Sequence, residues 1–179
     1  MQHGKQHGFA YLSVLIIVAV MSIMTFKLSE DVSVRLARGK EADLLFNGDQ
    51  VARAIRGYYE NGPVRGCYPP NLEVLLEDRR DFHVLRHLRK IFPDPMHARV
   101  SLPDGSLDAQ PVNDGGWHLI KEESGRIVGV SSESLATPFK QIKFADGRKE
   151  FEGKSQYADW KFIAKGSAVK PASPGACGQ

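Results

Sequence analysis

The sequence predicts an α+β protein in which a long N-terminal helix packs on a small antiparallel β-sheet. Two observations point to this class. No proline interrupts residues 9–59, where apolar side chains recur with the period of an α-helix. After residue 95 the pattern changes to short runs of strand type, separated by turn sequences that contain glycine. With 179 residues, 42% of them hydrophobic, the chain is long enough for one domain with its own core and an additional N-terminal segment.

The first half of the expected helix is uncharged over residues 8–26. A helix over 9–26 is about 27 Å long, close to the thickness of the hydrocarbon core of a bilayer. We therefore expect 9–26 to cross a membrane and to contact membrane lipid. Ser13 and Ser22 can donate hydrogen bonds to their own helix, so they are tolerated there. Lys5 lies before the span, which predicts a cytoplasmic N-terminus and a C-terminal domain on the other side of the membrane.

The second half of the expected helix, over residues 27–59, is amphipathic. Its apolar residues recur at helical spacing: Val32, Leu36, Leu44, Val51, Ile55 and Tyr59. We expect this face to lie on the soluble domain and the helix to end at 61–63, which reads Asn-Gly-Pro. Gly39 and Gly48 should soften the helix without ending it, at about 1 kcal/mol each relative to alanine.

Two short helices are expected next. Asn71 can cap the first, and the second would run over residues 79–92. The second helix would carry a basic face, made of Arg79, His83, Arg86, His87 and Lys90. His83 and His87 have the spacing of a helical metal site, but no third ligand is near in the sequence, so we interpret both as exposed residues on a basic surface. That surface could contact an acidic neighbour, anionic headgroups or, by default, only water.

Strand patterns follow. Short strands are expected in 99–107 around a Pro-Asp-Gly-Ser turn, a β-hairpin in 117–131, and a closing strand in 157–163. The composition of 165–179 indicates a flexible tail. Together with the long helix these segments predict the core: Leu44, Val51, Ile55, Leu72, Leu75, Leu88, Trp117, Ile127 and Trp160.

Motifs of catalysis are missing from the sequence. There is no glycine-rich phosphate loop and no His-Glu-x-x-His, and the Ser131–Ser134 run is interpreted as a solvated loop at the end of a hairpin. We predict neither an enzyme nor a cofactor. Oxygen ligands for calcium could come from Asp94, Asp104, Asp108 and Asp114, but they lack the order of an EF-hand loop, so no metal site is assigned.

The net charge and the cysteine content limit which partners and which cellular compartment fit this chain. A net charge of +3 is too small to indicate nucleic-acid binding by itself, and nucleic acid is not an expected partner. Two cysteines, Cys67 and Cys177, fit an exported domain with one disulfide. Because Cys177 lies in the expected flexible tail, free thiols remain an open alternative.

The N-terminal sequence carries a resemblance to a known family. The run Lys-Gln-His-Gly-Phe over residues 5–9, followed by aliphatic residues, resembles the class III signal of type IV pilins and type II secretion pseudopilins. The resemblance implies cleavage after Gly8 by the prepilin peptidase and methylation of the new N-terminal Phe9. In this family the fifth mature residue is usually a glutamate that pairs with the N-terminal amine of a neighbouring subunit, whereas this chain has Ser13. That departure predicts a minor or tip subunit, unless Ser13 is merely tolerated.

Later motifs extend the resemblance. Tyr68-Pro69, a leucine-rich segment and Asp94-Pro95 resemble the order of the major pseudopilin, over roughly the first 95 residues. Three runs are similar to an uncharacterised pseudopilin-like group: Asp94-Pro95-Met96, Trp117-His118-Leu119-Ile120 and Asp159-Trp160-Lys161-Phe162. The resemblance implies a leader at 1–8, a transmembrane half-helix at 9–26, a pilin-like α+β domain at 27–164 and the tail at 165–179.

The function implied by the resemblance is structural. The chain would be a single-pass protein of the bacterial inner membrane with a periplasmic domain, assembling through its N-terminal helix into a periplasmic fibre for type II secretion or a related pilus or competence system. Its partners would be other pseudopilins, the prepilin peptidase and the inner-membrane assembly platform. One alternative is a minor pilin that recruits DNA or a secreted substrate through the basic face of 79–92. Another is a stand-alone membrane-anchored domain.

Overall fold

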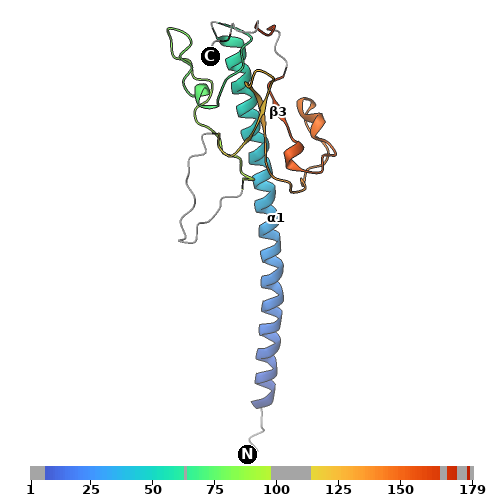
Figure 1. Ribbon diagram of the computed structural model, residues 1–179. Helices are drawn as coiled ribbons and strands as arrows, with labels where there is room; N and C mark the ends of the chain where they lie inside the picture. The colour runs from blue at the N-terminus through green and yellow to red at the C-terminus, as the bar shows by residue number, and fades with distance from the viewer. Residues whose placement is uncertain (1–6, 63, 98–113, 166–168, 173–176, 178–179) are drawn as a thin grey trace, which may run out of the picture. The chain divides into compact units, whose positions relative to one another are not determined.

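The computed structural model describes residues 7–62, 64–97, 114–165, 169–172 and 177, and leaves the side chains of 7–9 and 25–31 undescribed (Figure 1). One α-helix, α1, runs from His7 to Asn61, which confirms the prediction of a single long N-terminal helix. The expected stop after Asn61 is also confirmed. The chain divides into two compact units: unit 1, residues 1–39, and unit 2, residues 40–179.

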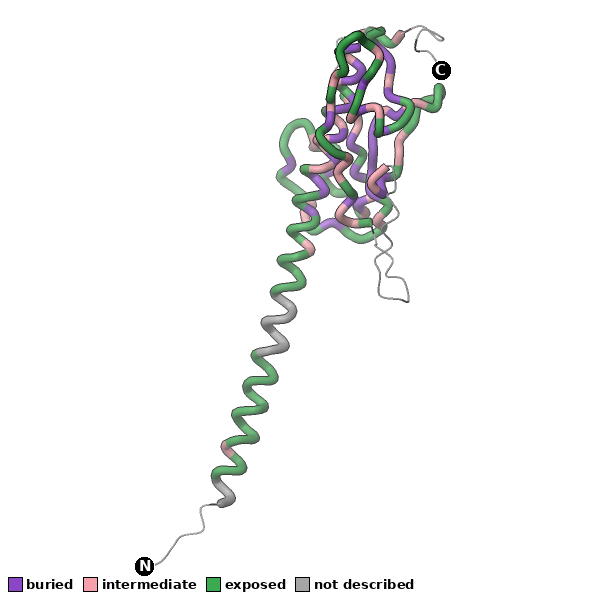
Figure 2. Tube along the Cα trace, turned by 90° about the vertical axis from the view of Figure 1, so that its left-hand side faces the viewer, coloured by how far each residue is buried: buried purple, intermediate pink, exposed green. Residues whose placement is uncertain are grey.

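The part of α1 that contributes to the core of unit 2 begins later than the sequence indicated. Val32 and Leu36 are exposed, so including them in the buried stripe was wrong. The buried stripe starts instead with Glu41 and Leu44 and continues along the helix to Tyr59. Figure 2 shows that the buried residues gather in unit 2.

The core of unit 2 combines residues of α1 with residues of the later chain. Leu44, Val51 and Ile55 on α1 are fully buried, and they belong to the same cluster as Trp117 and Trp160. Every residue of the predicted core is buried. The apolar pattern was sufficient here because fully buried positions tolerate few polar side chains.

The sheet has three antiparallel strands in the order β1-β2-β3: β1 His118–Lys121, β2 Ile127–Ser131 and β3 Phe162–Ile163. The predicted hairpin is therefore confirmed, and Gly125 in its turn has a φ of 81°, which favours glycine. The closing strand is shorter than expected, because Tyr157–Asp159 forms a 3-10 helix, η3. The segment between β2 and β3 also holds a second 3-10 helix, η2, at Asp146–Phe151.

Gly48 is the point where the sheet meets α1. A Cβ atom at this position would lie 2.5 Å from atoms of the Phe162 ring, much closer than any ordinary contact. Phe162, on β3, is also in edge contact with Trp117 at 6.1 Å between ring centroids, and with Phe151 at 5.2 Å. The missing side chain at Gly48 thus lets an aromatic layer lie directly on the helix backbone, which is a role beyond softening the helix.

The segment after α1 only partly follows the prediction. A 3-10 helix, η1 at Glu73–Leu75, stands where the first short helix was expected. Its N-cap position is Leu72, not Asn71 as predicted, but the Asn71 side chain does accept a hydrogen bond from Val74 N at 3.1 Å. The predicted helix over 79–92 was wrong. Asp78 and Leu85 instead pair through two backbone hydrogen bonds and close a loop, and the backbone N–H groups of His87 and Leu88 both donate to Leu75 O.

Candidate functional site

The N-terminal part of α1 presents an apolar surface all around the helix. Over residues 10–24 the large apolar side chains are exposed, with Tyr11 at 69% and Met24 at 62% at the two ends. The hydroxyl of Ser13 donates to Ala10 O at 2.8 Å, and that of Ser22 donates to Val18 O at 2.8 Å. Both hydroxyl groups therefore have hydrogen-bond partners within the helix, and the rest of the helix surface is formed by apolar side chains. Patches of this kind are typical of membrane or protein interfaces.

The predicted processing site lies at the start of the same helix. The backbone of Gly8 and Phe9 falls in the first turns of α1, but the side chain of Phe9 is outside the described residues. Ser13 follows one turn later and is partly exposed. Within the part of the chain that the structure describes, no helix is both long enough and apolar enough to cross a membrane.

The predicted basic face does not exist as a helical face. Arg79, His83, Arg86 and Lys90 are exposed, but they follow an irregular backbone. The side chain of His87 is only 7% exposed, and its Nε2 lies 3.1 Å from Asp78 Oδ2. Interpreting His87 as an exposed surface residue was therefore wrong, and the two histidines do not form a pair.

A buried ionic cluster around Asp78 replaces that face. The Asp78 carboxylate is 2% exposed and accepts hydrogen bonds from the Arg80 side chain, Nε at 2.9 Å and Nη2 at 2.7 Å. The Arg80 guanidinium also lies 3.4 Å from the centre of the Tyr58 ring and donates to Tyr58 O at 2.8 Å. Burial alone would raise the pKa of Asp78, but the hydrogen bonds from Arg80 and His87 outweigh it and lower the pKa to about 2. The cluster fixes the loop after η1 against the end of α1.

A second buried acid, Glu41, connects α1 to the segment before η2. Its carboxylate is 6% exposed and accepts hydrogen bonds from Phe139 N at 2.7 Å, Lys140 N at 3.1 Å and the Tyr157 hydroxyl at 2.7 Å. Burial, followed by this contact with Glu41, raises the pKa of Tyr157. The sequence analysis missed Glu41. A signal existed, because Glu41 lies three residues before Leu44 and therefore on the apolar face of the helix.

A third buried pair joins Asp94 and Ser132. The Ser132 hydroxyl, 1% exposed, donates to Asp94 Oδ2 at 2.7 Å, and Met96 N donates to Asp94 Oδ1 at 2.8 Å. Interpreting Ser131 and Ser132 as a solvated loop was therefore wrong. Burial raises the pKa of Asp94.

The structure describes two of the four possible calcium ligands, Asp94 and Asp114. Of the other three aspartates considered, Asp114 accepts a hydrogen bond from Gly116 N at 2.9 Å, and Asp104 and Asp108 lie outside the described residues. The described residues contain no group of three or more metal-ligating side chains.

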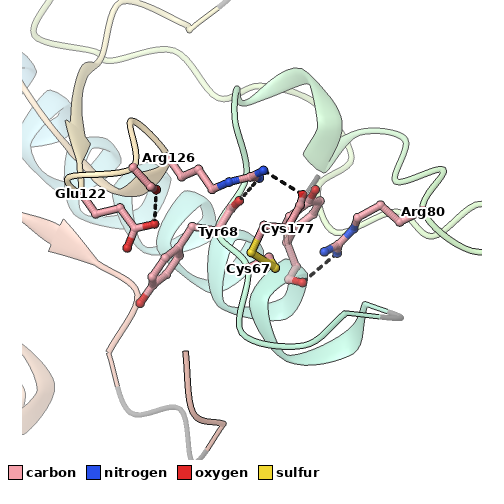
Figure 3. Close-up of a disulfide and its surroundings, with 8 residues drawn as sticks. Cys67, Tyr68, Arg80, Glu122, Arg126 and Cys177 are labelled. Atoms are coloured by element: carbon pink, nitrogen blue, oxygen red, sulfur yellow. Dashed lines mark hydrogen bonds between the residues drawn. A yellow bond between two sulfur atoms is a disulfide. The ribbon is translucent and has the colours of Figure 1, made fainter. Parts of the chain in front are cut away.

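Cys67 and Cys177 form a disulfide that spans 110 residues of sequence, with the Cα atoms 5.5 Å apart. Figure 3 shows the Arg126 side chain directed at two backbone carbonyls beside this bond, Tyr68 O at 2.9 Å and Cys177 O at 2.8 Å. The Tyr59 hydroxyl donates to Val169 O at 3.2 Å. The described residues of the expected flexible tail are thus attached to the end of α1 and to the segment that follows it.

Comparisons with protein-family models, with curated proteins and with solved structures found no match to this chain. The features that bear on function are therefore the exposed apolar helix of unit 1, and the disulfide and surface grooves of unit 2. The first of these is the most unusual for a protein in water, because its apolar side chains are exposed on every side.

Proposed function

We propose that this protein is a membrane-anchored, pseudopilin-like subunit that assembles through its N-terminal helix into a periplasmic fibre. The observation that carries the proposal is the exposed apolar surface over residues 10–24 of α1. The uncharged run of the sequence, 8–26, extends at both ends into residues whose side chains are not described. An apolar helix of this kind is stable in lipid, where its backbone polar groups are satisfied within the helix.

The same surface suits a fibre as well as a membrane. Apolar helices associate by close packing of their side chains once they leave the lipid, so one surface can serve the membrane-bound subunit and the assembled one. Ser13 fits a subunit without a charged pairing group, since its hydroxyl is already used at Ala10 O, 2.8 Å away. This supports the interpretation as a minor or tip component.

The disulfide supports export of the C-terminal unit. Disulfides persist in oxidising compartments, such as the bacterial periplasm, and are rare in the cytosol. Cys67 and Cys177 are paired, and the sequence contains no other cysteine. A periplasmic location of unit 2 is consistent with a positively charged leader that stays in the cytoplasm.

The alternative function, recruitment of DNA or substrate by a basic helix face, is not retained. It required Arg79, His83, Arg86, His87 and Lys90 on one helix, and the described backbone of 79–92 is irregular.

The test of the proposed function is processing of the full chain by a prepilin peptidase in bacterial cells. Mass spectrometry of the membrane fraction should show an N-terminal, methylated Phe9. Gly8→Val should block the cut, because the added side chain crowds the peptide bond that the peptidase must reach. Gly4→Val is the matched control, since Gly4 also follows Gln-His and lies before the cut. Retention of Met1 in the wild-type chain beside an active peptidase, or an equal effect of both variants, would refute the proposal.

A further inference from the structure

A groove on unit 2 gathers positive charge from three separate segments. It has a volume of about 290 Å³ and lies between α1, η2 and β3. Its cations are Arg53 and Arg56 on α1, Arg148 on η2, and Lys161 and Lys165 on either side of β3. We call this feature the basic groove. Because these segments are far apart in the sequence, only the folded domain brings the charges together.

The acidic residues of the basic groove neutralise only part of this charge. Asp49 accepts a hydrogen bond from Arg148 Nε at 3.0 Å, and Glu150 pairs with Lys165. The lining holds five cations and two carboxylates, and so carries an excess of three positive charges, one of which is paired with Glu60 outside the groove.

The least compensated cations come from two walls of the groove, one formed by α1 and the other by β3 and the residues beside it. The Arg53 side chain is 73% exposed, and its Nη2 is 3.8 Å from Asp49 Oδ2, too far for a hydrogen bond. Lys161 is exposed and makes no ion pair with any described residue. Arg56 is shared with Glu60, outside the groove, at 3.0 Å. Arg53, held only by this long contact with Asp49, and Lys161 are therefore available to bind an anion placed between the walls.

Apolar side chains also line the basic groove. Phe151 and Phe162 contribute and are almost fully buried, and Ile163 and Ala164 are partly buried. A ligand that fits must therefore combine negative charge with apolar groups. A phosphate chain has no apolar groups of this kind.

We infer that the basic groove binds an acidic, extended segment of a protein partner. Carboxylates of that segment pair with Arg53 and Lys161 on the two walls, and its apolar side chains contact the partly buried Ile163 and Ala164. Arginine is well suited to this role, because its planar guanidinium can bind a carboxylate through two hydrogen bonds. The inference concerns unit 2 alone and holds whether or not the chain is processed after Gly8.

The test measures peptide binding by the oxidised full chain in a zwitterionic detergent. The probe is a fluorescein-labelled hexapeptide of alternating glutamate and leucine, followed by fluorescence anisotropy. The variant Arg53→Glu/Lys161→Glu reverses one charge on each wall. Arg38→Glu/Lys154→Glu is the matched control, because it changes one exposed arginine of α1 and one exposed lysine that does not line the groove. Tryptophan fluorescence verifies that both variants are folded.

The groove variant should weaken peptide binding at least about tenfold and the control variant less than about twofold, because only the first replaces attraction by repulsion at the site. A hexapeptide of alternating lysine and leucine should not bind. Three results would overturn the inference: no binding of the acidic peptide, equal loss in both variants, or full displacement of the peptide by equimolar pyrophosphate or by a single-stranded oligonucleotide. The processing experiment at Gly8 tests unit 1, whereas peptide binding tests unit 2. A failure of the proposed function can therefore be distinguished from a failure of this inference.

Discussion

Replacing Gly48 by alanine tests whether the sheet rests on α1 through the missing side chain. The new Cβ would lie 2.5 Å from the Phe162 ring, and an ordinary carbon contact needs about 3.5–4 Å, so the ring must move by roughly 1 Å. Phe162 is 3% exposed and touches Trp117 and Phe151, which leaves it little room. Overpacking of this kind costs about 1–3 kcal/mol, against a gain of about 1 kcal/mol for alanine over glycine in a helix.

Gly39→Ala separates the two effects. Gly39 lies in the same helix, and nothing is within 4 Å of its Cβ position. This variant should leave the free energy of unfolding unchanged or raise it by up to about 1 kcal/mol. Gly48→Ala should therefore be less stable than Gly39→Ala by about 1–3 kcal/mol.

The assay is urea unfolding of the full chain, followed by tryptophan fluorescence. Trp117 and Trp160 are both buried in unit 2, so the signal reports on this unit. Shortening the opposing side chain by Phe162→Leu should reduce the penalty of Gly48→Ala in a double-mutant cycle, because the two positions are in contact. Equal stabilities of the two glycine variants, or no coupling between 48 and 162, would refute the role assigned to Gly48.

Three further predictions follow from other contacts. The pKa of Asp78 falls to about 2 from a usual 3.8, so its ionised form adds about 2 kcal/mol to the free energy of unfolding. This stability is present above pH 4 and is lost as the pH falls through 2. Urea unfolding across this range should show the loss in the wild type but not in Asp78→Asn. Cys177→Ser should lower the free energy of unfolding by about 2–5 kcal/mol in the absence of reductant, and dithiothreitol should lower the wild type by a similar amount without affecting the variant. If Ser13 marks a minor or tip subunit, quantitative mass spectrometry of purified fibres should find far fewer copies of this chain than of the major subunit, whereas fibres built mostly of this chain would contradict that role.

The sequence was sufficient to predict elements that depend on local periodicity. The long proline-free helix, its end at Asn61, the β-hairpin around Gly125 and the residues of the core all follow from the spacing of apolar side chains and from turn chemistry. These patterns are local in sequence, and they are reliable because a buried position strongly favours an apolar side chain.

The prediction over 79–92 was wrong because long-range contacts decide that segment. Its apolar residues are spaced as in a helix, but the Arg80 guanidinium donates to Tyr58 O on α1, and the backbone N–H groups of His87 and Leu88 donate to Leu75 O. The pairing of Asp78 with Leu85 then excludes the helix. Helix propensity is worth only a few tenths of a kcal/mol per residue, so such contacts readily override it.

The buried polar pairs were hidden for a related reason. Glu41 and Ser132 find their partners near 140 and at Asp94, far along the chain, and no spacing rule connects such positions. Only Glu41 could have been noticed, as a charged residue on an apolar helix face. The basic groove likewise depends on three segments that the fold brings together.

The bond between Cys67 and Cys177 also sets an order of events during biosynthesis. Ribosomes add about 5–20 residues per second, so Cys177 follows Cys67 after roughly 5–20 s. During that interval Cys67 has no partner within its own chain, because the sequence holds only these two cysteines. Any early mispairing must therefore join two different molecules. In the oxidised domain, with Cys177 in place, Cys67 is 3% exposed, so the completed bond is shielded from attack by other thiols.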